Sequence, residues 1–126
     1  QLSEVEFINA VLAEADCRFL LDVNNIYVNS VNFNYDADAF LRDIDGARTL
    51  YIHVAGHYEE APDLRIDTHG TSVIEPVWQL LRDAYARYGN LPTLLERDFN
   101  FPRMAELLGE VEQIRRLQRD SASARG

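Results

Sequence analysis

Four stretches of the chain carry apolar residues at the three- and four-residue spacing of an amphipathic helix. The predicted helices run over 4–15, over 37–44, from a cap at Ser72 to Gly89, and from a cap at Asn100 to Leu117. Each of them starts at a residue type that caps helices. Ser3 and Ser72 stand three residues before a glutamate, as in a capping box, and Asp36 and Asn100 can accept hydrogen bonds from first-turn amides.

Three short apolar runs, rich in β-forming residues, predict buried strands. They are 19–23, 49–55 and the segment LPTLLERD at 91–98. The segment NNIYVNSVNFNY holds five asparagines between positions 24 and 34, and we expect it to be a polar loop. EEAPD is expected to be a loop as well, and LRIDTHG is expected to be short and extended.

The alternation of helices and strands predicts an α/β fold in which parallel strands are joined by crossover helices. Three clear strands are few for an independent α/β domain, and a TIM (β/α)8 barrel needs eight. We therefore expect about half of such a barrel over residues 1–119. Residues 120–126, which end in SASARG, are expected to form a flexible tail.

The charge and cysteine content of the chain limit the kinds of molecule that it can be expected to bind. The 126 residues carry a net charge of −9, from 12 basic and 21 acidic side chains. This balance argues against nucleic acid or an anionic membrane surface as the main partner, but it is compatible with bound cations. Cys17 is the single cysteine, so no intrachain disulfide can form. There is no apolar run of membrane-spanning length and no secretory signal, so we expect a cytoplasmic protein. Because the chain begins inside a helix signal without a methionine, it is consistent with a piece of a longer protein.

Side-chain alternation along the predicted strands places polar residues together. In each strand one face changes from apolar to polar near the C-terminal end, and parallel strands bring those ends to one edge, where α/β folds hold ligands. All three histidines fall in the segment HVAGHYEEAPDLRIDTHG. The expected constellation is Asp22, Asn24, His53, Asp67, His69 and Glu96, with His57 on the adjoining loop.

Imidazole nitrogens and carboxylate oxygens are the donors that iron, manganese and zinc use. A multivalent cation would also remove the cost of burying several carboxylates together. Each residue has an ordinary explanation too. A histidine at a strand end is commonly just hydrogen-bonded, Asp67 can cap local backbone, and Asp22 and Asn24 can satisfy loop amides. From the pattern alone, a metal site and a set of ordinary polar contacts both stay open.

Five segments taken together carry a family resemblance: LLDVNNIYVNSVN, HVAGH, IDTHG, PTLLERD and the N-x-P that follows. In this order they closely resemble the DUF692 (UPF0276) proteins, also called multinuclear non-heme iron-dependent oxidases, which include the methanobactin-maturation enzyme. The resemblance implies a TIM barrel of the xylose-isomerase type that holds two or three iron ions. It also implies oxidation of cysteine, and sometimes of other residues, in ribosomally made precursor peptides by dioxygen, often with a leader-recognition partner protein.

The resemblance also implies metal ligands by motif position. They would be Asn24 or Asp22, His53, Asp67, His69 and Glu96, with His57 as a further ligand or a supporting group. Asp98 and Asn25 would not bind the metal themselves but would orient its ligands through hydrogen bonds. Only the C-terminal half of the family is present, roughly the fifth to eighth barrel strands, so further ligands are missing. We therefore expect the chain alone to be inactive, or to need the N-terminal half-barrel or self-association.

The preferred interpretation is an iron-dependent oxidase or oxygenase of a precursor peptide. The first alternative is a metal-dependent hydrolase or isomerase on the same barrel, in which zinc or manganese activates water and Glu96 or Asp22 is the base. The second is a non-catalytic fragment that packs against another chain. No residue beyond the metal ligands is assigned a catalytic role.

Overall fold

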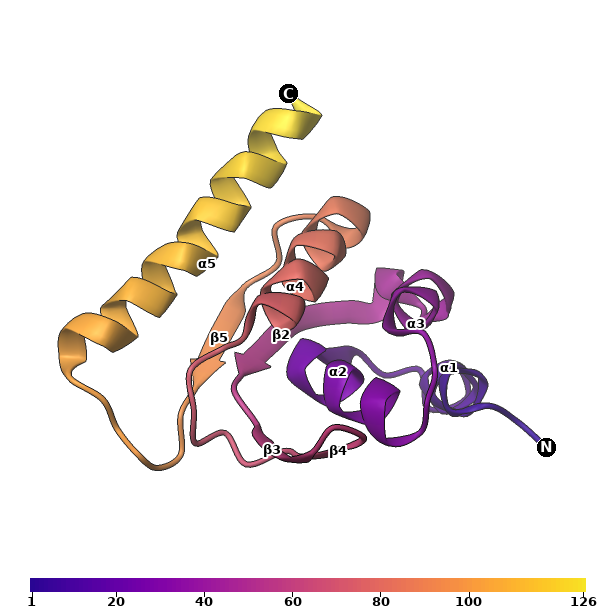
Figure 1. Cartoon of the computed structure of the whole chain (residues 1–126). Helices are drawn as coiled ribbons and strands as arrows, with labels where there is room; N and C mark the ends of the chain where they lie inside the picture. Colours follow the sequence, from indigo (N-terminus) through magenta and orange to yellow (C-terminus); the bar gives the residue numbers. More distant parts are fainter.

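The computed structural model describes residues 1–126 and contains a three-stranded parallel sheet with helices packed on it (Figure 1). Its strands are β1 (Phe19–Asp22), β2 (Thr49–Ala55) and β5 (Thr93–Glu96), in the order β1-β2-β5. The helices are α1 (Glu4–Ala15), α2 (Val23–Asn32), α3 (Ala37–Asp43), α4 (Glu75–Tyr88) and α5 (Met104–Arg125), with a 3-10 turn η1 (Gly46–Arg48). A separate antiparallel hairpin is formed by β3 (Tyr58–Ala61) and β4 (Leu64–Ile66).

Parallel pairing of the three strands confirms the α/β prediction. Asp22 pairs with His53, and Ala55 pairs with Glu96, so the C-terminal ends of the strands lie at one edge. Successive strands along the chain occupy neighbouring positions and are joined through helices, which is the arrangement of parallel β/α units. The sheet is compatible with part of a TIM barrel. The segment around β4 pairs only with β3, so it does not contribute a fourth parallel strand as a count of four β/α units would require.

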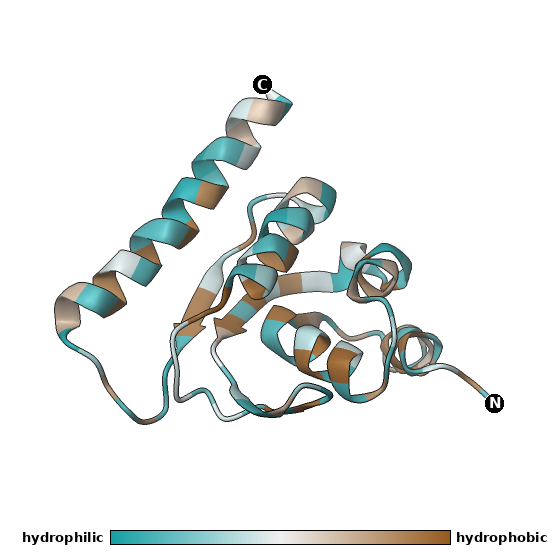
Figure 2. Cartoon of the chain, viewed as in Figure 1, coloured by the Kyte–Doolittle hydropathy of each residue, from teal (hydrophilic) through white to brown (hydrophobic).

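One face of the sheet carries the core. Leu21, Ile52 and Val54 are fully buried there, and α2 and α4 cover them, with Leu81 and Tyr85 fully buried in the same cluster. Figure 2 shows the corresponding hydrophobic bands on β2 and on the helices in front of it. The opposite face is more exposed to solvent, as the 53% exposure of Leu94 shows. Leu50 is 57% exposed and lies where the pairing of β1 with β2 shifts by one residue.

The asparagine-rich segment after β1 is a helix, which corrects the predicted polar loop. Asp22 caps α2 by accepting a hydrogen bond from the Asn25 amide at 2.8 Å. Val23 and Ile26 are buried at helical spacing. Asparagine disfavours helices mainly because its side chain competes for the backbone. Here the side-chain amides of Asn25 and Asn32 donate to the Asp67 carboxylate and to the Arg65 carbonyl. They therefore do not compete for the hydrogen bonds of the helix backbone.

Two of the four predicted caps are wrong, although the helices exist. Helix α4 begins after Ile74 without a side-chain cap, and the neighbouring Val73 amide donates to the Glu110 carboxylate of α5 at 2.8 Å. Helix α5 begins after Arg103 rather than after Asn100. The capping box of Ser3 and the ending of α4 at Gly89, where φ is 97°, are confirmed.

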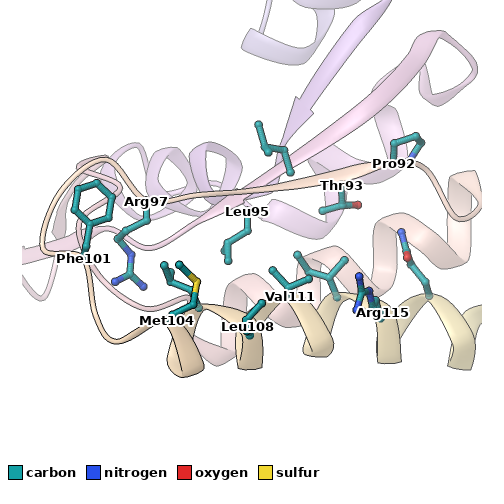
Figure 3. Close-up of a pocket in the computed structure, with 13 residues that line it drawn as sticks. Pro92, Thr93, Leu95, Arg97, Phe101, Met104, Leu108, Val111 and Arg115 are labelled. Atoms are coloured by element: carbon teal, nitrogen blue, oxygen red, sulfur yellow. The ribbon is translucent and has the colours of Figure 1, made fainter.

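Helix α5 stands beside β5 at the edge of the molecule (Figure 1). A cavity of about 670 Å³ separates the two, lined mainly by apolar side chains such as Leu95, Leu108 and Val111 (Figure 3). The helix continues to Arg125 and includes most of 120–126; the flexibility of that segment stays a prediction. None of the helices combines the length and the apolar character needed to cross a lipid bilayer.

Candidate metal centre

The polar residues at the strand ends converge as the alternation predicts. Asp22 ends β1, His53 lies beside it in β2, and Glu96 ends β5. The segment that follows the hairpin folds back over this edge. The amide of His69 donates to the carbonyl of Gly56 at 3.2 Å, and the carbonyl of His69 accepts from the amide of Asp98 at 2.9 Å. The backbone of His69 is therefore held between the ends of β2 and β5.

His69 is the centre of the cluster. Its Nδ1 lies 3.1 Å from Oδ2 of Asp98 and 3.4 Å from Oε1 of Glu96. Its Nε2 lies 2.8 Å from Oδ1 of Asp67, but the contact lacks hydrogen-bond geometry, so this buried nitrogen has no hydrogen-bond partner. A buried polar nitrogen without a partner is costly unless a group outside the chain satisfies it.

Two sets of possible ligand atoms share His69. Asp22, Asp67 and His69 form one set, and His69, Glu96 and Asp98 form the other, with the ligand atoms of each set within 4.8 Å of one another. His53 joins the second set through a distance of 3.3 Å from its Nδ1 to Oε2 of Glu96. The two sets together offer only nitrogen and oxygen donors, as iron, manganese and zinc sites do. Cys17 is exposed and belongs to neither set.

Asparagine side chains from α2 hold Asp67. Asn24, which is fully buried, donates from Nδ2 to Oδ1 of Asp67 at 2.7 Å, and Asn25 donates to Oδ2 at 3.3 Å. His57 lies behind this pair. Its Nδ1 is 2.9 Å from Oδ1 of Asn24, and its ring centroid is 5.2 Å from that of Tyr27. The geometry thus places His57 against an amide rather than among the carboxylates, and its role as a ligand stays a prediction.

Burial and neighbouring charges together shift the pKa values of Asp22, His57 and His69. Burial raises the pKa of Asp22, and the nearby charge of Asp67 adds to the rise against the hydrogen bond from the Asn25 amide. Burial, with the positive charge of Arg65, lowers the pKa of His57. For His69, burial acts to lower the pKa, but the hydrogen bond to Asp98 and the surrounding carboxylates outweigh it, so its pKa is raised. The cluster therefore has an excess of negative charge.

Two supporting residues were not anticipated from the sequence. Asn29 donates to Oδ1 of Asn25 at 3.1 Å and to Glu4 of α1 at 3.2 Å, which fixes the amide of Asn25 toward Asp67. The spacing of Asn25 and Asn29 by four residues would have indicated the pair, had α2 been predicted as a helix. Gly56 has its carbonyl in this network, and a Cβ there would lie 2.1 Å from the carbonyl oxygen of Thr71. The glycine directly after the strand in HVAGH was the available signal.

The donor set fits a metal ion. Four carboxylates lie within reach of His53 and His69, and Nε2 of His69, which is buried without a hydrogen-bond partner, faces Asp67. In the absence of a cation, such a group of carboxylates would repel one another. The residues that the strand-end pattern predicts as ligands are thus adjacent in space, and their assignment as ligands remains a prediction.

Comparison with known proteins shows which family the sequence matches. The sequence model of a family described as "RiPP precursor modification enzyme MbnB/TglH/ChrH" matches residues 1–119. A UPF0276 protein of Shewanella amazonensis is 63% identical over 118 residues, which cover 94% of this chain and 42% of that protein. UPF0276 proteins of Pseudomonas aeruginosa and Nitrosospira multiformis are 55% and 52% identical over 124 and 123 residues. The chain spans less than half the length of these relatives, at 42% to 44%.

Proposed function

The chain belongs to the MbnB/TglH/ChrH family of enzymes that modify RiPP precursors, and from that premise we propose that it supplies part of an iron site that oxidises a precursor peptide with dioxygen. RiPPs are ribosomally made peptides that are modified after synthesis, and the family implies a metal-dependent enzyme. The group modified would be a cysteine, or another residue, of the precursor. The residues that would hold iron are Asp22 or Asn24, His53, Asp67, His69 and Glu96.

The observation that carries the proposal is the position of His69 between two sets of carboxylates. Its Nε2 is buried without a hydrogen-bond partner beside Asp67, and its Nδ1 faces Glu96 and Asp98. Bound iron would supply the capacity to react with dioxygen and to bind a thiolate. The side chains keep the donors fixed: Asn24 and Asn25 orient Asp67, and Asp98 orients His69.

The proposal includes partners. A precursor peptide would be the substrate, and a leader-recognition protein would help to present it. The sheet has open edges at β1 and β5, and the cavity between β5 and α5 exposes Leu108 to 59% and Met104 to 66% (Figure 3). We take these surfaces as the contact with the remainder of a TIM barrel of the xylose-isomerase type. The isolated chain would then be inactive, or would need that remainder or a second copy.

Metal loading tests the assignment. The chain is loaded anaerobically with Fe²⁺, alone and after co-expression with the part of the Shewanella amazonensis relative outside the matched region, and bound iron is measured. His69→Ala and Glu96→Ala are each expected to lower the iron content at unchanged far-UV circular dichroism. Glu14→Gln, an exposed change on α1, is the control and should retain it.

Oxygen uptake separates the alternatives. Consumption of dioxygen with a cysteine-containing precursor peptide is expected for the iron-loaded complex. Stoichiometric zinc or manganese with no uptake would support the hydrolase or isomerase. A chain and a complex that bind no metal would support a non-catalytic fragment. Full iron content in both ligand variants would contradict the proposed site.

A further inference from the structure

His69 has a backbone conformation that needs support. Its φ is 56°, in the left-handed region that non-glycine residues seldom adopt. Its neighbour Gly70 does not share this positive φ. The imidazole can face Asp67 on one side and Glu96 on the other only while the backbone stays in this conformation, since a change in φ would redirect the side chain. Something in the structure must therefore stabilise the turn at 69–70.

Three contacts from the loop after β5 reach this turn. The Asp98 amide donates to the His69 carbonyl at 2.9 Å, and Nδ2 of Asn100 donates to the Gly70 carbonyl at 3.2 Å. The ring of Phe99 lies against Gly70 so closely that a Cβ on the glycine would be 2.4 Å from the ring. We call these three contacts the 98–100 clasp. Asn100 itself has a φ of 53°, which asparagine tolerates better than most residues do.

The exposure of the clasp residues argues against a role in the core. Phe99 is 46% exposed, and Asp98 and Asn100 are exposed as well. The ring of Phe99 leaves almost half its surface in water, and it lies on the residue next to His69. Neither Phe99 nor Asn100 offers a metal ligand to the cluster. Their contacts act on the backbone that carries His69.

We propose that Phe99 and Asn100 are positioning residues: by clasping the 69–70 turn they hold the His69 imidazole between the two sets of carboxylates. The inference deepens the proposed function, because it concerns the residues that aim one proposed ligand. It predicts that loosening the clasp weakens metal binding without unfolding the protein. Partners that orient ligands in this way are typically worth 10- to 100-fold in metal affinity.

The test combines ring signals with metal titration on the whole chain. Selective labelling of histidine gives three sets of ring signals, since the chain has three histidines. Asn100→Gly removes the donor and still accommodates a positive φ, and Asn100→Asp removes it at nearly the same size. Asn34→Gly is the matched control, because Asn34 has the same φ of 53° and is exposed beyond the end of α2.

In the metal-free chain, both Asn100 variants are expected to shift or broaden the His69 signals and to speed exchange of the Asp98 amide, whereas Asn34→Gly leaves both unchanged. In titrations with Co²⁺, the dissociation constant is expected to rise about tenfold or more in the Asn100 variants. Unchanged His69 signals and a dissociation constant within twofold of the wild type would overturn the proposal. If the wild type binds no Co²⁺, the proposed metal site fails at this readout, and the metal-free ring signals still decide the clasp.

Phe99 is tested through its contact with Gly70. Gly70→Ala should push the ring away and shift the His69 signals, and Phe99→Ala should shift them by removing the ring. Because the clash needs both side chains, the double variant is expected to lose no more Co²⁺ affinity than Phe99→Ala alone. Fully additive losses would show that the ring does not act through Gly70. Fluorescence of Trp78, the single tryptophan, reports that each variant remains folded.

Discussion

Replacing Asn24 with alanine is expected to lower the free energy of unfolding by about 3 kcal/mol. The side chain is fully buried, and it contacts three polar groups of other segments. Its Nδ2 donates to Asp67 at 2.7 Å and to the Gly56 carbonyl at 3.4 Å, and its Oδ1 faces Nδ1 of His57 at 2.9 Å. Alanine satisfies none of these groups.

The magnitude follows from the partners that are left behind. A hydrogen bond to a charged carboxylate is worth ~1.5–3 kcal/mol, and a buried nitrogen without a partner costs ~1–3 kcal/mol. Alanine favours a helix over asparagine by at most ~0.7 kcal/mol, which offsets only part of the loss. Asn29→Ala, in the same helix but half-buried, is the control. Its loss should stay below ~1 kcal/mol, because its partners Asn25 and Glu4 keep contact with water.

Urea denaturation followed by Trp78 fluorescence measures the change, since Trp78 is 7% exposed in the folded chain. A double-mutant cycle with Asp67→Ala isolates the contact, and a coupling of about 1–2 kcal/mol is expected between Asn24 and Asp67. Asn24→Ala within ~0.5 kcal/mol of the wild type, or a coupling of zero, would refute the reasoning that buried amides hold the carboxylate.

Three further predictions concern other parts of the fold. Gly56→Ala should cost well over ~1 kcal/mol and lower the melting temperature measured by circular dichroism, because its Cβ would lie 2.1 Å from the Thr71 carbonyl oxygen, which is backbone and cannot rotate away; an unchanged melting temperature would contradict this. Burial raises the pKa of Tyr88 to about 12 and also raises the pKa values of Tyr35 and Tyr85, so the late phase of the absorbance at 295 nm should lose the amplitude of one tyrosine in Tyr88→Phe. Because the folded pKa is the higher one, the stability linked to Tyr88 is complete below the unfolded pKa of ~10 and is lost as the pH rises toward the folded value. Leu81→Ala, at a fully buried position, should lower the free energy of unfolding by ~2–5 kcal/mol in urea denaturation. Leu108→Ala, at a position 59% exposed, should change it by no more than ~0.5 kcal/mol. Equal losses would show that the Leu108 side chain is buried and would contradict the exposed face of α5.

Periodicity was enough to place the strands, because the burial of one face repeats along each of them. Leu21, Ile52 and Val54 face the helices, and their polar neighbours in sequence face the other way. Local patterns failed where a distant partner decided the outcome. Asparagine is a residue type that commonly caps helices, but the side-chain amide of Asn100 donates to the Gly70 carbonyl instead, and helix α5 begins at Met104.

The site shows the same division. Strand alternation could bring His53 and Glu96 to one edge, since both lie in paired strands. It could not give the orientation of His57, which depends on Asn24 lying in a helix that the sequence had indicated as a loop. Nor could it show that the hairpin β3–β4 would return the chain so that His69 lies over the sheet edge. Pro62 and Asp63 are typical turn residues and predict the turn itself, but the contacts of His69 with Gly56 and Asp98 join segments that are distant in sequence.

The clustering of all three histidines between positions 53 and 69 now has a physical explanation, and it differs for each of them. His57, whose pKa is lowered by burial, contacts the amide of Asn24, so it supports Asp67 indirectly. His53 and His69 face carboxylates directly, and His69 lies between two sets of them. Four carboxylates around two imidazoles leave an excess of negative charge, and the raised pKa of His69 is that same excess acting on the imidazole. A bound multivalent cation would offset this excess of negative charge, which supports the proposed metal site.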